Sequence, residues 1–175
     1  MFDSNRPWIF CAESEMNRPT TSSGKDEFSL AKRSAFHFLK IRDRSEKEIR
    51  TQLNKKKFSQ ETIEQTVQYL KKLELINDRQ FARDWIRMRL QKPFGLRRIF
   101  FELKTLKGVS EEILKEEMSV GSKEYSPDEA LAALVQKRVS KYKNLDEPKR
   151  KRRVFEYLIR RGFDLEQVKK VVERL

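Results

Sequence analysis

The chain has 175 residues and a formal net charge of +13, with 38% charged and 37% hydrophobic residues. This length fits one ordinary domain or a short array of small modules. Only five glycines and five prolines occur, which favours helices joined by short loops over strands joined by many tight turns. The sequence has no apolar run of about 18 residues and no recognisable signal peptide, so we expect a cytoplasmic protein without a membrane segment.

The sequence contains a single cysteine, Cys11, and a single histidine, His37. An intrachain disulfide needs two cysteines, and a structural zinc site needs about four ligands drawn mainly from cysteine and histidine, so we expect neither. His37 lies in an apolar stretch and is interpreted as a packed or half-exposed helix residue rather than a catalytic base. Glycine-rich phosphate loops are also missing. The sequence therefore predicts a binding protein, not an enzyme, that needs no metal, cofactor or small-molecule substrate.

Residues 1–27 show no helical period, and their prolines and polar residues predict a flexible tail. Helix-start signals recur after it. Ser45 and Glu48 have the spacing of a capping box, in which each side chain accepts the other residue's backbone N–H. Ser126 repeats this signal ahead of Pro127, which suits a first helical position. These signals and the apolar periodicity predict nine helices, over residues 28–42, 46–57, 60–74, 78–91, 96–107, 111–118, 127–143, 148–161 and 165–174.

Three apolar ladders show that the chain is repetitive. Their members are Ile49, Leu53, Phe58, Ile63 and Val67; Ile99, Leu103, Val109 and Ile113; and Val154, Leu158, Phe163, Val168 and Val172. The first and third ladders have spacings of 4, 5, 5 and 4, the second has 4, 6 and 4, and the first-to-fourth distance is 14 in each. A step of four keeps residues on one helical face, so the irregular step predicts a tight turn between two helices. These turns are expected at 54–57, 104–108 and 159–162.

An apolar helix precedes each helix–turn–helix, so each unit is expected to hold three helices. The predicted organisation is all-α, with three tandem three-helix repeats at 28–76, 77–121 and 122–175 after the tail. A unit of about 45–50 residues buries little surface by itself. Neighbouring repeats should therefore lean on each other in an elongated, modular array.

The positive charge belongs to the repeats. Residues 1–27 carry three basic and five acidic residues, whereas residues 28–76 carry twelve and six, residues 77–121 ten and seven, and residues 122–175 fifteen and nine. A positive field of this extent attracts polyanions such as nucleic acid or acidic protein surfaces.

A DNA-reading helix–turn–helix would place its last helix in the major groove, with basic or amide side chains toward the base edges. The charges argue against that use. The predicted third helices carry two basic and three acidic residues (60–74), one and four (111–118), and three and two (165–174). Each of the three predicted second helices, by contrast, carries a net positive charge. We therefore interpret the turn as a compact way to pack three helices, with binding left to the basic faces beside it.

Three basic patches are the candidate binding residues. The first patch lies at the first turn and comprises Lys55, Lys56 and Lys57, and the second lies in the second repeat and comprises Arg87, Arg89, Arg97 and Arg98. The third patch occupies the last repeat: Lys149, Arg150, Lys151, Arg152, Arg153, Arg160 and Arg161. Five consecutive basic residues exceed the mixed charge of an ordinary solvated surface, which favours polyanion contact over a merely solvated stripe. The aromatic residues Phe155 and Tyr157 are expected to pack inward.

The same residues resemble the RecX family. Residues 75–82 (LINDRQFA), followed by Arg89 and Gly95, look like the central signature of that family, and Arg44-Ser45 and Arg160-Arg161-Gly162-Phe163 resemble its first and last repeats. The resemblance covers about residues 30–175. One departure is the first turn, where Lys57 stands at the place of a glycine that would supply a left-handed cap.

The resemblance implies three three-helix repeats that bind the RecA–single-stranded DNA filament along its groove. It further implies inhibition of RecA ATP hydrolysis, strand exchange and co-protease action, and hence a role in DNA repair, recombination and the SOS response. We expect a monomer whose partner is the RecA filament and whose contact with DNA itself is weak and non-specific. The alternative is a direct, non-sequence-specific DNA-binding protein with helix–turn–helix-like units.

Overall fold

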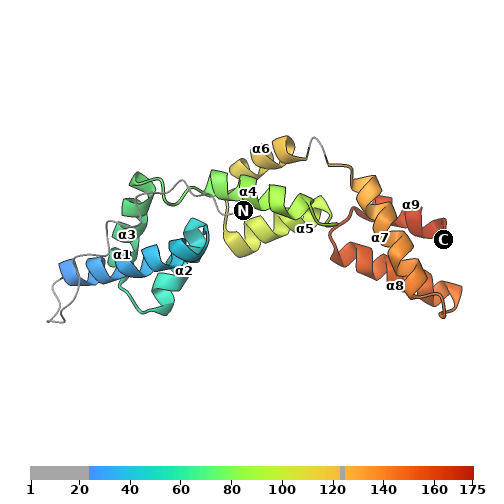
Figure 1. Ribbon diagram of the computed structural model, residues 1–175, viewed down its shortest axis with the longest axis horizontal. Coiled ribbons are helices and arrows are strands. Elements are labelled where there is room, and N and C mark those ends of the chain that lie inside the picture. Colours follow the sequence, from blue (N-terminus) through green and yellow to red (C-terminus); the bar gives the residue numbers. More distant parts are fainter. Residues whose placement is uncertain (1–23, 123–124) are drawn as a thin grey trace. The chain divides into compact units, whose positions relative to one another are not determined.

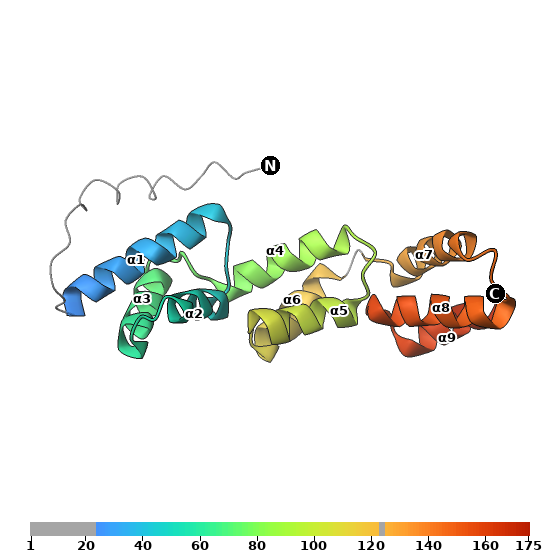
Figure 2. The same cartoon turned by 90° about the horizontal axis from the view of Figure 1, so that it is seen from below.

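The structure is a computed structural model that describes residues 24–122 and 125–175, apart from the side chains of residues 24, 25 and 127. The tail predicted at 1–27 therefore lies almost wholly outside the described residues, as does Cys11. The chain divides into two compact units, residues 1–77 and 78–175. The described part of the first unit is one three-helix repeat, and the second unit holds the other two (Figures 1 and 2).

All nine predicted helices are confirmed within the described residues, and their bounds differ from the expected ones by a few residues. They are α1 (Gly24–Ile41), α2 (Glu46–Lys55), α3 (Gln60–Lys72), α4 (Asp78–Leu90), α5 (Leu96–Phe101), α6 (Glu111–Gly121), α7 (Pro127–Lys141), α8 (Glu147–Arg160) and α9 (Leu165–Glu173). A π-helix, η2 (Glu102–Lys107), continues α5 without a break.

Each repeat has its own hydrophobic core. In repeat 1 the core joins α1, α2 and α3, with Ile49 and Leu53 fully buried. In repeat 2 it centres on Ile99 and Leu103, and in repeat 3 on Leu158. Phe155 and Tyr157 pack against the third core as predicted. The ladder residues of the second helices are thus core residues, because a spacing of four stacks them on the inner face of each second helix.

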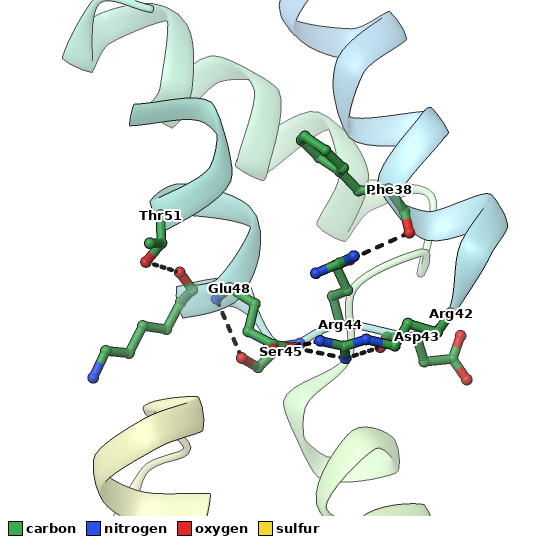
Figure 3. Close-up of polar contacts among 8 residues, drawn as sticks. Phe38, Arg42, Asp43, Arg44, Ser45, Glu48 and Thr51 are labelled. Carbon is green, nitrogen blue, oxygen red and sulfur yellow. Dashed lines mark hydrogen bonds and ion pairs between the residues drawn. The ribbon is translucent and has the colours of Figure 1, made fainter. Parts of the chain in front are cut away.

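The predicted capping box at the start of α2 is present (Figure 3). The Glu48 N–H donates to Ser45 Oγ at 3.3 Å, and the Ser45 N–H donates to Glu48 Oε2 at 3.4 Å. Arg42 binds the same carboxylate through both terminal nitrogens, at 3.0 and 2.7 Å. Arg44 donates to the carbonyl of Phe38 at 3.3 Å, so both arginines tie α1 to the start of α2.

A residue with positive φ closes the second helix of every repeat. These residues are Lys57 (φ 64°), Gly108 (φ 72°) and Gly162 (φ 83°). The missing glycine in repeat 1 therefore leaves Lys57 in the left-handed conformation, in which its Cβ crowds the backbone. The turn is kept, but with a strained residue.

The second ladder differs from the prediction in one position. Its fourth member is Leu114, which is fully buried, whereas Ile113 only packs against the edge of the core. The N–H of Leu114 donates to the cap residue Ser110, as Ile63 does to Ser59. Repeat 2 therefore contains one extra residue before its third helix.

The π-helix takes up this extra residue. The turn predicted at 104–108 is shorter than expected, because residues 102–107 continue the helix and only Gly108 turns. The N–H of Val109 donates to the Leu103 carbonyl at 3.1 Å, one residue further along than the Phe58–Leu53 bond of repeat 1. An insertion inside a helix that must keep both ends in the core commonly produces such a π segment.

Candidate polyanion-binding surface

The five-residue basic run lies in the first half of α8 and is not equally available to a ligand. The side chains of Lys149 and Arg152 are 74% and 81% exposed, although each has a nearby carboxylate partner, Asp146 and Glu156. Arg153 is exposed as well, whereas Arg150 and Lys151 are half-buried. Acidic neighbours one turn away are solvated pairs of little energetic weight. The run therefore presents Lys149, Arg152 and Arg153 outward.

The junction of repeats 2 and 3 brings four predicted residues together. The Gly95 N–H donates to the Arg161 carbonyl at 2.9 Å, and Arg98 Nη1 donates to the Arg160 carbonyl at 3.1 Å. Arg97 Nη1 lies 3.7 Å from a carboxylate oxygen of Asp164. Basic residues that are about sixty positions apart in the sequence thus form one surface within the second unit.

Three of the predicted arginines surround one aromatic ring. The guanidinium carbons of Arg89, Arg98 and Arg161 lie 5.3, 4.9 and 4.8 Å from the centroid of the Phe94 ring. Such cation–π contacts are worth about 0.5–1 kcal/mol each at exposed sites. These arginines therefore help to build the junction, and only part of their charge faces outward.

The buried carboxylate of Glu102 forms ion pairs with two of these arginines. Its side chain is 7% exposed and forms ion pairs with Arg89 at 2.8 Å and Arg98 at 2.9 Å, and the Trp85 indole N–H donates to it at 3.3 Å. A buried charge is tolerated only with such partners. Sequence reasoning missed Glu102, Trp85 and Phe94. The i,i+4 spacing of Arg98 and Glu102 was the available signal.

The remaining predicted residues of the second unit, Arg87, Arg97 and Arg160, are exposed. The first patch lies in the other unit, at the end of α2. Lys55, Lys56 and Lys57 are exposed, and Lys56 also donates to Ser34 Oγ at 3.1 Å.

The third helix of repeat 2 uses its acidic residues inside the repeat. Glu117 of α6 is buried and accepts from Arg83 Nε at 2.9 Å and from Arg79 Nη1 at 3.2 Å, both on α4. The hydrogen bond from Arg83, with a smaller contribution from that of Arg79, holds the pKa of Glu117 below its ordinary value. The helix that would read DNA in a helix–turn–helix protein is here an internal packing element.

No group of three or more potential metal ligands occurs among the described residues. His37 is exposed on α1, with its ring 6.2 Å from the Phe38 ring. None of the described helices is both long and apolar enough to cross a bilayer.

Comparison with known proteins identifies the repeats. Models of the first, second and third three-helix domains of RecX match residues 31–70, 77–118 and 126–172. Regulatory protein RecX of Prosthecochloris aestuarii is 35% identical over 143 residues, which cover 81% of this chain and 90% of the relative. The chain belongs to the RecX family. Regulatory protein RecX of Clostridium perfringens is 33% identical over 86% of this chain and 71% of its own length.

Two solved RecX structures share the fold. RecX from Lactobacillus salivarius superposes with a TM-score of 0.70 at 20% identity, over 86% of this chain and 97% of that one. A second regulatory protein RecX gives a TM-score of 0.75 at 21% identity, over 91% and 83% of the two chains. The protein is thus all-α, with three tandem RecX three-helix domains, and its curated relatives are named as regulators.

Proposed function

We propose that this protein binds the RecA–single-stranded DNA filament and inhibits RecA ATP hydrolysis, strand exchange and co-protease action. It thereby regulates recombination and DNA repair. The proposal includes a monomer that works in the cytoplasm, without catalysis, cofactor or small-molecule substrate. Membership of the RecX family supports the regulatory role, and the distribution of charge supports the kind of partner.

The observation that carries the proposal is where the charges lie in each repeat. The second helices present cations such as Arg97, Arg152 and Arg153 outward, whereas Glu117 of the third helix in repeat 2 is used within its repeat. A surface of this kind attracts the phosphates and carboxylates of a nucleoprotein without reading base edges.

A titration of the full chain against preassembled RecA filaments on single-stranded DNA tests the proposal. RecA ATP turnover should fall as the protein is added. The variant Lys149→Glu/Arg153→Glu should inhibit less, while its helical circular dichroism stays unchanged because both side chains are exposed. Lys115→Glu on α6 is the matched control, since that side chain is 72% exposed but lies on a third helix. Unchanged ATP turnover at a molar excess of the protein would refute the proposal.

The same basic patches favour a second candidate, direct DNA binding without sequence preference. Affinity for naked duplex would then fall with salt, with a slope of log affinity on log salt of about −0.9 for each phosphate contact. Binding to naked DNA as tight as binding to the filament would favour this second function.

A further inference from the structure

Two large apolar side chains in the middle repeat lie outside its core. Phe101, the last residue of α5, is 55% exposed, and Leu106 in the π-helix is 57% exposed. Neither packs against the repeat 2 core, which is formed by their neighbours Ile99 and Leu103. Exposed apolar residues are ordinary when they are scattered singly, so what matters is whether these two form one site.

The other repeats have polar residues at the same places. Phe101 lies two residues after the ladder residue Ile99, where repeat 1 has Thr51 and repeat 3 has Glu156. Leu106 lies three residues before Val109, and the corresponding residues are Lys55 and Arg160. Core packing explains why the inner faces of all three second helices are apolar. It does not explain the two apolar residues on the outer face of the second helix in repeat 2, which have no counterpart in the other two repeats.

The π-helix places the two side chains on one side. Its i→i+5 hydrogen-bonding pattern stacks residues five apart, as i→i+4 bonding does for residues four apart in an α-helix. Phe101 and Leu106 are separated by five positions across Glu102–Lys107. The extra residue of repeat 2 thus aligns an aromatic and an aliphatic side chain that an uninterrupted α-helix would point in different directions. π-Bulges of this kind are frequent at functional sites.

A cation borders this apolar pair. Arg97 precedes Phe101 by four residues within α5, which puts both on the same helical face, and its side chain is 68% exposed. Lys104 lies inside the π-helix and pairs instead with Glu111 at 2.6 Å. A matching surface would carry an apolar group beside a carboxylate. A phosphate backbone alone would satisfy Arg97 but would give Leu106 no partner.

We propose that Phe101 and Leu106, bordered by Arg97, are a docking site for an acidic protein surface that inserts an apolar side chain beside a carboxylate. This inference rests on the proposed function, and under it the partner is a RecA protomer of the filament. The π-helix then makes the middle repeat the protein-binding one, while the basic runs of the outer repeats supply general attraction. Burial of apolar surface is the dominant favourable contribution to most protein–protein association.

The test uses the full chain with Phe101→Gln/Leu106→Gln. Glutamine keeps a helix propensity close to that of the residues it replaces, so the fold should be preserved. Leu30→Gln is the matched control, because Leu30 is 54% exposed on helix α1 of repeat 1. The measurements are affinity for RecA–single-stranded DNA filaments and for the naked strand. The double variant should bind the filament at least tenfold more weakly, which corresponds to about 1.4 kcal/mol, while the control and naked-strand binding stay unchanged.

A photo-crosslinking residue at position 101 should in addition capture RecA, whereas one at position 30 should not. Filament binding by the double variant equal to wild type, or a loss that appears equally on naked DNA, would overturn this inference and leave the proposed function standing. Failure of the wild-type chain to bind the filament at all would overturn both.

Discussion

Gly95 should be the residue that joins repeats 2 and 3. It occupies the N-cap of α5, with φ −71° and ψ 152°, a conformation that any residue adopts. The equivalent caps are Ser45 and Asp146, both favoured N-cap residues. Repeat 2 has glycine because a Cβ at position 95 would overlap the carbonyl of Gly162 in the next repeat.

Substitution should therefore open the junction. Gly95→Ala would break the bond from the Gly95 N–H to the Arg161 carbonyl and pull Arg98 away from the Arg160 carbonyl. Two hydrogen bonds at about 0.5–1.5 kcal/mol each, with one cation–π contact of Arg161 to Phe94 at about 0.5–1 kcal/mol, give roughly 1.5–4 kcal/mol. The opening equilibrium should rise by about one to three orders of magnitude.

Amide hydrogen exchange followed by NMR measures this opening residue by residue. The Gly95 amide is protected only while the junction is closed, so residue 95 should exchange faster in the variant, while the core amides of Leu103 and Leu158 keep their protection. Gly95→Ser separates the two effects of alanine, because serine restores a good N-cap but still carries the Cβ. It should open the junction just as far. Undiminished protection of residue 95 in both variants would refute the reasoning.

Three further predictions concern single repeats. Lys57→Gly should raise the free energy of unfolding of repeat 1 by about 1 kcal/mol, because glycine accepts the positive φ of that residue without strain; equal urea midpoints would contradict this. Glu117→Gln should lower the stability of repeat 2 against urea by about 1–2 kcal/mol, since Arg83 loses an ion pair whose carboxylate is buried and whose guanidinium is exposed. An unchanged urea midpoint would show that this ion pair does not stabilise the repeat. Arg50 holds the pKa of Glu64 at about 2, below 4.5, so this contribution to the stability of repeat 1 is fully present above pH 4.5 and disappears as the pH falls toward 2. Thermal unfolding of Glu64→Gln should lose less between pH 4.5 and pH 2 than wild type does, and parallel curves would count against this contribution.

Local patterns made the helices and repeats predictable. A spacing of four marks the buried face of a helix. A serine or aspartate whose side chain can accept a backbone N–H of the first turn marks its start. The bounds of α2 and α9 can therefore be predicted without knowledge of distant residues. The absence of glycine at position 57 was also visible, whereas the structure shows that Lys57 adopts the positive φ of the two glycines at the equivalent turns.

The same local reasoning assigned the wrong fourth member to the second ladder. Ile113 and Leu114 are adjacent and both apolar, and the equal distance of 14 favoured Ile113. The choice depends on how the helix before Gly108 ends, and the π-helix that settles it is stabilised by burying both Leu103 and Val109. Sequence spacing cannot show which of two helical windings a core imposes.

The sequence by itself determined the helical class, the presence of three repeats and the positive charge of those repeats, because each follows from residues within a few turns of one another. Tertiary structure alone decided which cations remain available. Arg89, Arg98 and Arg161 look alike in the sequence, yet they surround Phe94, and the buried carboxylate of Glu102 forms ion pairs with two of them. Ion pairing and close backbone approach, such as that of Gly95 to Gly162, depend on distances between residues far apart in the chain, which only the folded arrangement fixes.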